Sequence, residues 1–225
     1  MSAVNEKKVA ALEAVKYIKS GMTVGLGTGS TAFFMIEAIG EMVKNGLQIK
    51  AVATSDETEK LAKKMGIEVI TLAEAQRLDV TIDGADEVDE DFQLIKGGGG
   101  ALLREKIVAH NSDLNVIIAD SSKSVAKLGK FKLPIETIPF ATQLILKELD
   151  GMGLSPVQRM KGDKAYKTDE NNDILDIDIW DTEIELNDLE QQLKSIPGVV
   201  ETGLFLTSTN VVIIGKGEVA VIKKK

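Results

Sequence analysis

Short apolar runs alternate with helical stretches through the N-terminal half of this chain, and this alternation constrains the fold more than any other feature. Strands are predicted by the apolar runs at 22–26, 48–54, 67–72, 79–82 and 115–119. Helices are predicted around them, at 4–19, 31–44, 56–65 and 100–110. Such alternation favours an α/β fold with a mostly parallel, Rossmann-like sheet and helices on both faces. Ligands of these sheets bind at the carboxyl ends of the strands, so we expect the functional residues there.

The pattern changes near residue 130, and all four prolines lie beyond that point. Residues 155–180 predict a β-hairpin with a polar turn at 169–173. Helical stretches at 139–150 and 185–195 flank this hairpin. These elements predict a smaller α+β, ferredoxin-like domain.

We place this smaller domain at 131–206, as an insert in a main catalytic domain formed by 1–130 and 207–225. The last apolar runs, at 210–214 and 219–222, predict strands that return to the main sheet. Lys223, Lys224 and Lys225 are interpreted as a solvated tail.

The composition excludes several kinds of chemistry. The formal net charge of −8 repels a phosphate backbone, so we expect no nucleic-acid partner. The absence of cysteine excludes disulfides, thiolate nucleophiles and Cys-based zinc sites. The single histidine, His110, leaves no His-rich metal site and is interpreted as a residue at the C-terminus of a helix.

The chain carries no signal for a membrane or for export. Its N-terminus has charges among its apolar positions, and no run of 18 apolar residues occurs. We expect a soluble, cytoplasmic protein without a membrane partner.

The first candidate site is the glycine turn GLGTGSTA at 25–32. Glycines let backbone N–H groups approach an anion, and Ser30 or Thr31 can cap the following helix. The alternative is a well-capped strand–helix connection without a ligand. A Walker A loop is excluded because no Lys follows Gly29, and the glycine spacing does not match the dinucleotide fingerprint. Asp56 is interpreted as the N-cap of the next helix rather than as a ribose-binding acid.

The second candidate is KGGGGALLREK at 96–106. Four successive glycines are entropically costly to order, which favours a backbone that wraps closely around a ligand. The alternative is a flexible hinge.

Acidic residues follow the predicted strand at 79–82. Asp83 and Asp86 lie at its carboxyl end, where ligands are expected, although Asp-Gly turns often use such side chains to bind their own backbone. The rest of the acidic run, which is Glu87, Asp89, Glu90 and Asp91, is interpreted as solvated. Lys96 could neutralise negative charge that develops on a reacting oxygen.

Glu105 is the strongest candidate for a general base. On a helix from about 100 it shares a face with Ala101, Val108 and Ala109. A carboxylate on such an apolar face is partly desolvated, which favours general-base chemistry. The alternative is a surface glutamate paired with a Lys or Arg. Arg104 and Lys106 are expected to point elsewhere.

Seven motifs in order resemble type A ribose-5-phosphate isomerases. They are GTGST at 27–31, TSDETEKLA at 54–62, DGADEVD at 83–89, KGGGGALLREKIV at 96–108, ADSSK at 119–123, LGKFKLPIETIPFA at 128–141 and IPGVVETGLF at 196–205. The resemblance implies interconversion of ribose 5-phosphate and ribulose 5-phosphate, in the non-oxidative pentose phosphate pathway, without a metal or coenzyme. It also implies a homodimer or homotetramer.

The resemblance implies roles for individual residues. Glu105 is the implied base, with Asp83 moving hydroxyl protons and Lys96 stabilising an enediolate oxygen. The implied substrate-binding residues are Lys7, Thr28, Gly29, Ser30, Thr31, Asp83, Gly84, Ala85, Asp86, Lys96, Gly97, Gly98, Gly99 and Lys123. Leu103 departs from the family pattern, in which a small polar residue is usual.

Two other functions stay open. One is a related phosphosugar deaminase or lactonase, which would be expected to use a catalytic His, and only His110 is present. The other is a non-catalytic sugar-phosphate sensor, which ought to carry a recognition domain that this acidic chain does not show.

Overall fold

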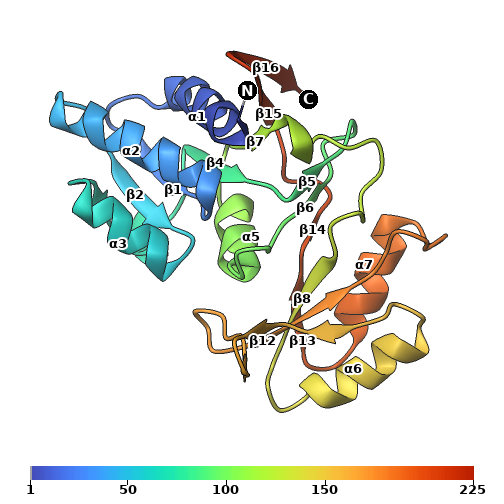
Figure 1. Ribbon diagram of the computed structural model, residues 1–225. Coiled ribbons are helices and arrows are strands. Elements are labelled where there is room, and N and C mark those ends of the chain that lie inside the picture. Colours follow the sequence, from blue (N-terminus) through green and yellow to red (C-terminus); the bar gives the residue numbers. More distant parts are fainter. Residues whose placement is uncertain (1) are drawn as a thin grey trace. The chain divides into compact units, whose positions relative to one another are not determined.

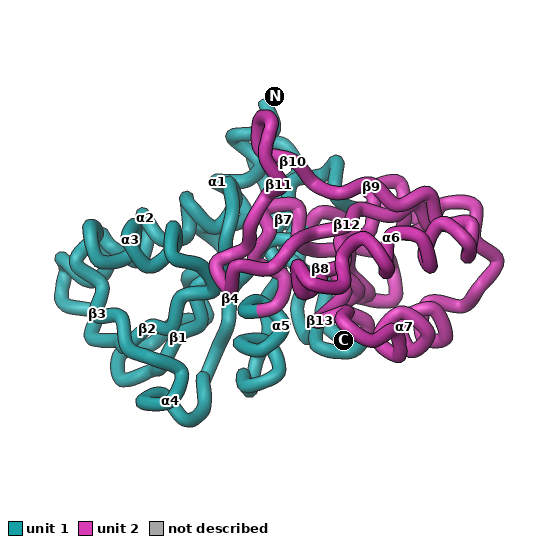
Figure 2. Tube along the Cα trace, turned by 90° about the horizontal axis from the view of Figure 1, so that it is seen from below, with its two compact units in different colours: residues 1–85, 104–124, 207–225 teal, residues 86–103, 125–206 magenta. Residues whose placement is uncertain are grey.

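The structure is a computed structural model and describes residues 2–225. The chain forms two compact units (Figure 2). The first unit comprises the described residues through Ala85, together with Arg104–Ser124 and Thr207–Lys225; the second comprises Asp86–Leu103 and Val125–Leu206. The predicted insert at 131–206 lies within the second unit, and its division from 1–130 stays a prediction.

The first unit contains a seven-stranded sheet in the order β16-β15-β7-β4-β1-β2-β3 (Figure 1). Its strands are β1 (Thr23–Leu26), β2 (Lys50–Ala53), β3 (Glu68–Val69), β4 (Val80–Gly84), β7 (Asn115–Asp120), β15 (Val211–Lys216) and β16 (Val219–Lys224). Neighbouring strands are parallel, except that β16 runs antiparallel to β15. The predicted mostly parallel sheet is confirmed.

Helices cover both faces of this sheet, as predicted. They are α1 (Ala3–Ala14), the short 3₁₀ helix η1 (Val15–Tyr17), α2 (Ser30–Lys44), α3 (Asp56–Lys64), α4 (Leu72–Ala75), α5 (Leu102–His110) and the 3₁₀ helix η2 (Ser121–Lys123). One face packs with α1, α2 and α3 into a core that includes Val24, Ala51 and Ile82. The other packs with α4 and α5 through Val52 and Val108. Successive residues of one strand, such as Ala51 and Val52, thus pack against helices on opposite faces of the sheet.

The second unit contains a β-α-β-β-α-β arrangement, which is ferredoxin-like. Its elements are β8 (Leu133–Thr137), α6 (Thr142–Gly151), β9 (Val157–Gln158), β12 (Asp173–Ile177), α7 (Leu186–Ser195) and β13 (Val199–Thr202). The sheet is antiparallel in the order β13-β8-β12-β9, and both helices contribute to a core that includes Ile135, Ile145 and Leu189. Smaller elements are β5 (Glu87–Val88), β6 (Leu94–Ile95) and β14 (Leu204–Phe205), which form one sheet, and the pair β10 (Met160–Lys161) and β11 (Lys164–Ala165).

The predicted hairpin at 155–180 contains a second turn. Strands β9 and β12 pair antiparallel, but β10 and β11 form a tight hairpin between them. Its turn includes Gly162 at φ 63°, a backbone conformation that glycine adopts without strain. A single turn at 169–173 was therefore an incomplete prediction.

The solvated tail predicted for the last three residues is wrong for their backbone. Lys223 and Lys224 belong to β16, where they pair with Val212 and Val211 of β15, and the Lys225 N–H donates to the Asn210 carbonyl oxygen over 3.0 Å. Exposed lysines suit an edge strand, because their charge discourages pairing with another chain.

Part of the acidic run is also buried, contrary to the prediction that it is solvated. Glu87 is 3% exposed, and its two carboxylate oxygens accept hydrogen bonds from the Gly129 and Phe131 N–H groups, each over 2.7 Å. Asp89 is half-buried, and this burial raises the pKa of its carboxyl above the usual value. Donors far away in the sequence stabilise the buried Glu87 carboxylate, which the local charge pattern does not indicate.

Candidate active site

The strand order of the main sheet reverses between β1 and β4. Strands β2 and β3 follow on one side of β1, whereas β7 follows on the far side of β4. Such a switch point leaves a crevice at the carboxyl ends of the two central strands. The turn at 27–30 follows β1, and Asp83 lies in the last residues of β4. The topology therefore places both sequence motifs at the position where a ligand is expected.

Gly27 allows the ends of β1 and β4 to approach closely. A Cβ atom at this position would lie 2.0 Å from Asp83 Oδ1 and 2.5 Å from Asp83 Cα. Real Cβ atoms do not approach a backbone atom so closely, so only glycine fits here.

Asp83 is 3% exposed and is oriented by the backbone. Its Oδ1 accepts hydrogen bonds from the Gly84 N–H over 2.7 Å and from the Thr28 N–H over 3.1 Å. The first of these is the turn contact that the sequence offered as the alternative interpretation of Asp83. The second joins the acidic motif to the glycine turn.

A cluster of hydroxyl groups lies behind this turn. The Thr28 hydroxyl lies 2.7 Å from Thr54 Oγ1 and donates to Ser55 Oγ over 2.8 Å, while the Thr58 hydroxyl donates to the Gly27 carbonyl oxygen over 2.9 Å. The cluster fixes the turn from the side of α3. The sequence pattern did not predict this hydroxyl cluster, because the cluster joins residues about 30 positions apart.

The predicted N-cap at Asp56 is wrong. Ser55 caps α3, because its Oγ accepts from the Thr58 N–H over 3.1 Å. Asp56 is the first residue of the helix, and its Oδ1 pairs with Arg104 Nη1 over 2.8 Å. A carboxylate in the first turn of a helix is favoured by the helix dipole.

The N-terminus of α2 has the properties of an anion site. Gly29, at φ 106°, precedes the helix, and the first-turn N–H groups of a helix carry partial positive charge. The Lys7 ammonium donates to Ser30 Oγ over 2.9 Å and lies 4.0 Å from Asp120 Oδ2. A groove of about 440 Å³ borders the turn and is lined in part by Lys7, Thr28, Gly29 and Ser30. The structure thus brings Lys7 to the glycine turn, while Thr31 is buried in the first turn of α2.

Glu6 joins the segments that carry two candidate lysines. Its carboxylate accepts from the Ser121 hydroxyl over 2.7 Å, from the Ser121 N–H over 3.0 Å and from the Gly217 N–H over 3.0 Å. These hydrogen bonds lower the pKa of Glu6 from 4.5 to about 2. Ser121 begins η2, which ends at Lys123, so Glu6 fastens η2 to the helix that carries Lys7. Sequence reasoning missed Glu6, because its partners are more than 100 residues away.

We expect the Glu6→Gln protein to be less stable than wild type at neutral pH, by an amount that shrinks in acid. A carboxyl whose pKa is lowered by folding stabilises the folded state above its unfolded pKa of 4.5, and this contribution is lost as the pH falls toward 2. The measurement is the difference in urea midpoint between the two proteins at pH 7, 4.5 and 3. Glu13→Gln, at a half-buried glutamate of the same helix that pairs with Lys16, is the control. A difference that stays constant over this pH range would contradict the assignment.

The glycine run of the second unit adopts a defined turn. The Gly100 N–H donates to the Gly97 carbonyl oxygen over 3.0 Å, and both glycines have positive φ, at 102° for Gly97 and 79° for Gly100. Asp86 Oδ2 accepts from the Gly98 N–H over 2.7 Å. The structure therefore brings Asp86 to the glycine run, and the alternative of a flexible hinge is not supported by these contacts.

Lys96 enters this run from β6. Lys96 is 3% exposed, its Nζ lies 5.5 Å from the centroid of the Phe205 ring, and its backbone N–H donates to the Gly203 carbonyl oxygen over 2.9 Å. An aromatic face favours a cation at this distance.

Glu105 is buried on α5, with 5% of its surface exposed. The alternative of a surface glutamate is therefore wrong. Because α5 begins at Leu102, Ala101 precedes the helix rather than sharing its face, while Val108 is buried on it as expected. His110 is exposed in the last turn.

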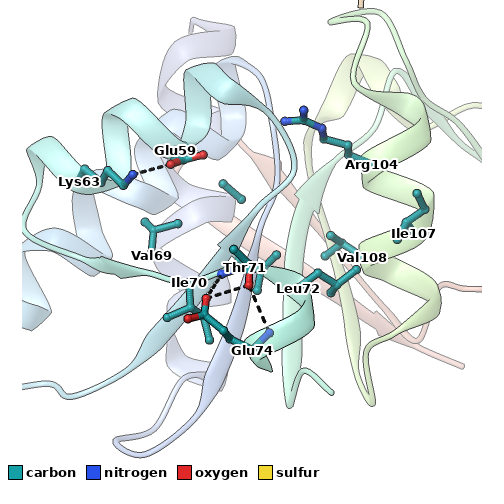
Figure 3. A pocket seen from close by; sticks show the side chains of 12 residues that line it. Glu59, Lys63, Val69, Ile70, Thr71, Leu72, Glu74, Arg104, Ile107 and Val108 are labelled. Carbon is teal, nitrogen blue, oxygen red and sulfur yellow. Dashed lines mark hydrogen bonds and ion pairs between the residues drawn. The ribbon is translucent and has the colours of Figure 1, made fainter. Parts of the chain in front are cut away.

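Arg104 lines a second pocket (Figure 3). This pocket has a volume of about 460 Å³, with apolar walls from β2, α4 and α5 and a charged rim. The rim lysine, Lys63, pairs with Glu59 over 2.5 Å, and Glu74 closes a capping box with Thr71. None of the described residues predicted for the site lines this pocket.

Within 2–225 no three His, Asp or Glu side chains are arranged to hold a metal ion. The same residues contain no helix that is long and apolar enough to cross a membrane.

The fold and these contacts define an α/β protein whose acidic, hydroxyl and lysine side chains gather at the carboxyl ends of a parallel sheet. Residues 50–218 match the family described as ribose 5-phosphate isomerase A (phosphoriboisomerase A). The chain is 50% identical to ribose-5-phosphate isomerase A of Ruegeria pomeroyi, over 94% of its own length and 84% of the relative's. It is 47% identical to the protein of that name from Listeria monocytogenes serotype 4b, over 98% and 100%. The chain therefore belongs to the ribose 5-phosphate isomerase A family.

Solved structures agree with this membership. Ribose 5-phosphate isomerase A from Methanocaldococcus jannaschii superposes with a TM-score of 0.93 at 39% identity, with all of both chains covered. A D-ribose-5-phosphate isomerase in complex with phospho-erythronic acid superposes with a TM-score of 0.95 at 37% identity, also over both whole chains.

Proposed function

We propose that this chain interconverts ribose 5-phosphate and ribulose 5-phosphate through an enediolate, with Glu105 as the base that moves the proton. The observation that carries the proposal is the burial of the Glu105 carboxylate on α5 in a member of this isomerase family. The reaction is an isomerisation, so no external oxidant or reductant is needed. C1 of the aldose is reduced while C2 is oxidised.

Glu105 would remove the proton from C2 of the open-chain aldose and return it to C1. A positioned carboxylate contributes roughly 10²–10⁴-fold to such a step. Asp83, which is held by the Gly84 and Thr28 N–H groups, would move the hydroxyl proton and assist ring opening. The role of Asp86 is to order the glycine run through the Gly98 N–H.

Lys96 and the N–H groups of Gly97 and Gly99 would stabilise the negative oxygen of the enediolate, while the Gly98 N–H stays bonded to Asp86 and shapes the turn. Removing one such preorganised donor costs about 3 kcal/mol of transition-state stabilisation. The positive charge of Lys96 suits this role, because it does not need to be reoriented as the oxygen becomes negative.

The glycine turn would hold the phosphate. Partial positive charge at the start of α2, the Lys7 ammonium beside Ser30, and Lys123 on η2 supply complementary charge. Binding of the phosphate, which does not react, can then position C1 and C2. Thr28 would act mainly through its backbone, because its hydroxyl already contacts Thr54 and Ser55. Gly29, Thr31, Gly84 and Ala85 would complete the two turns.

The test is incubation of the purified protein with ribose 5-phosphate and a chelator, followed by measurement of ketose. We expect ketose to form, and we expect deuterium from D₂O to enter the sugar. Release of ammonia from an aminosugar phosphate would instead indicate a deaminase. Binding of ribose 5-phosphate without turnover would indicate a sensor, and either result would overturn the proposal.

The setting of the enzyme is proposed on the same basis. We place it in the cytoplasm, in the non-oxidative pentose phosphate pathway, as a homodimer or homotetramer. Light scattering on the purified chain measures the subunit number.

A further inference from the structure

We propose that Arg159 is a positioning residue of the reaction, which fixes the glycine run that carries Lys96 so that its donors are aligned before substrate binds. This inference rests on the proposed function of Lys96 and Gly97–Gly99. Arg159 touches the backbone of the run and is not assigned to the substrate. It was not among the residues that sequence reasoning singled out.

The guanidinium of Arg159 bonds two successive carbonyl groups of the run. Its Nη1 donates to the Gly97 carbonyl oxygen over 2.7 Å and to the Gly98 carbonyl oxygen over 3.2 Å. The next carbonyl, that of Gly99, accepts from the Tyr166 hydroxyl over 3.0 Å. Three consecutive carbonyls are thus held from one segment, 159–166.

Arg159 is itself held firmly. Its Nε donates to Asp176 Oδ2 over 2.9 Å, and its Nη2 pairs with Asp176 Oδ1. This ion pair is largely buried, with side-chain exposures of 15% for Arg159 and 20% for Asp176. The Tyr166 ring lies 5.9 Å from the guanidinium carbon. A bidentate pair of this kind fixes the direction of the guanidinium plane as well as its position.

The main chain of Arg159 is also anchored to the small sheet. Its N–H donates to the Ile174 carbonyl oxygen over 2.8 Å, and its carbonyl accepts from the Tyr166 N–H over 2.9 Å. Both Ile174 and Asp176 belong to β12. The segment that holds the glycine run is therefore anchored to the sheet through β12 and is not a free loop.

Holding the carbonyls also sets the direction of the donors. In a planar trans peptide the carbonyl and the N–H of the next residue point in opposite directions. Arg159 therefore fixes the N–H groups of Gly98 and Gly99 when it binds the carbonyls of Gly97 and Gly98. The Gly98 N–H is held from the other side by Asp86 Oδ2.

The restraint that Arg159 places on the run matters because the run consists of four successive glycines, 97–100. Glycine loses more backbone freedom on ordering than any other residue, so an unrestrained run would sample many conformations. Misplacing a group by about 1 Å can cost about 10²-fold in rate. Arg159 and Tyr166 supply restraints that the glycines lack.

The test compares Arg159→Lys with wild type in steady-state assays on ribose 5-phosphate. Lysine keeps the charge but offers one nitrogen instead of a planar fork, so it cannot hold Asp176 and both carbonyls together. We expect kcat to fall about 10- to 100-fold while KM changes little. We also expect faster amide exchange in the peptide that contains 94–103.

Arg77→Lys is the matched control. Arg77 also pairs with an aspartate, Asp113, and also donates to two carbonyl oxygens, those of His110 and Ser112. A merely structural effect of replacing an arginine fork would lower stability in both variants. Only the Arg159 variant is expected to lose kcat.

Tyr166→Phe keeps the inference testable if Arg159→Lys does not fold. It removes one hydroxyl donor to Gly99, and we expect a loss in kcat of about 2- to 10-fold. A wild-type kcat in folded Arg159→Lys protein overturns the inference, as does a wild-type kcat in Tyr166→Phe. An inactive wild-type protein would instead overturn the proposed function.

Discussion

The Glu105→Gln protein is expected to fold normally and to lose about 10²–10⁴-fold in kcat toward ribose 5-phosphate. Glutamine has nearly the same shape as glutamate, so the packing of α5 around this buried position is retained. It cannot accept the C2 proton, so the general-base contribution is removed. Initial rates and a thermal melt measure the two effects separately.

Glu41→Gln is the control for this prediction. Glu41 lies on α2, with a side chain that is 66% exposed and paired with Lys44. We expect its activity to equal that of wild type. Near-normal turnover by a folded Glu105→Gln protein would remove Glu105 as the base.

The Gly27→Ala protein is expected to lose both stability and activity. The added methyl group would lie 2.0 Å from Asp83 Oδ1 and 2.5 Å from Asp83 Cα, so the ends of β1 and β4 have to move apart. Overpacking of this kind costs about 1–3 kcal/mol. In a chain of this size that corresponds to about 2–4 °C in melting temperature for each kcal/mol. Asp83 would move with its strand, so kcat/KM falls as well.

Gly151→Ala is the matched control, since a Cβ atom there meets no atom within 4 Å and the residue ends α6. Alanine at that position is expected to leave the melting temperature unchanged or raise it slightly. If Gly27→Ala were as stable and as active as wild type, the close approach of the two strands would not require glycine.

Local patterns predicted the parts of the fold that depend on neighbouring residues. Strands that are buried on both faces are continuously apolar, as in 115–119, so the sheet and its carboxyl edge could be located. Helical spacing likewise indicated that Glu105 faces inward. The same reasoning placed Asp83 and the glycine turn at the same edge of the sheet.

Contacts between distant segments could not be predicted in this way. The burial of Glu87 depends on N–H groups more than 40 residues away, and Arg159 reaches the glycine run across about 60 positions. Nothing in the sequence around Arg159 distinguishes it from an exposed arginine on a hairpin. Its role follows from the pairing of β9 and β12, which sets Asp176 beside it.

The order of strands in the main sheet has a consequence for synthesis on the ribosome. β15 lies between β7 and the edge strand β16, yet its residues, 211–216, begin only after residues 121–210 have followed β7. One side of β7 therefore has no partner while the larger part of the second unit, Val125–Leu206, is being made. During that interval α1, which contacts β7, or a chaperone has to shield the apolar residues of 115–119. Otherwise the unpaired edge of β7 could pair with a strand of another chain.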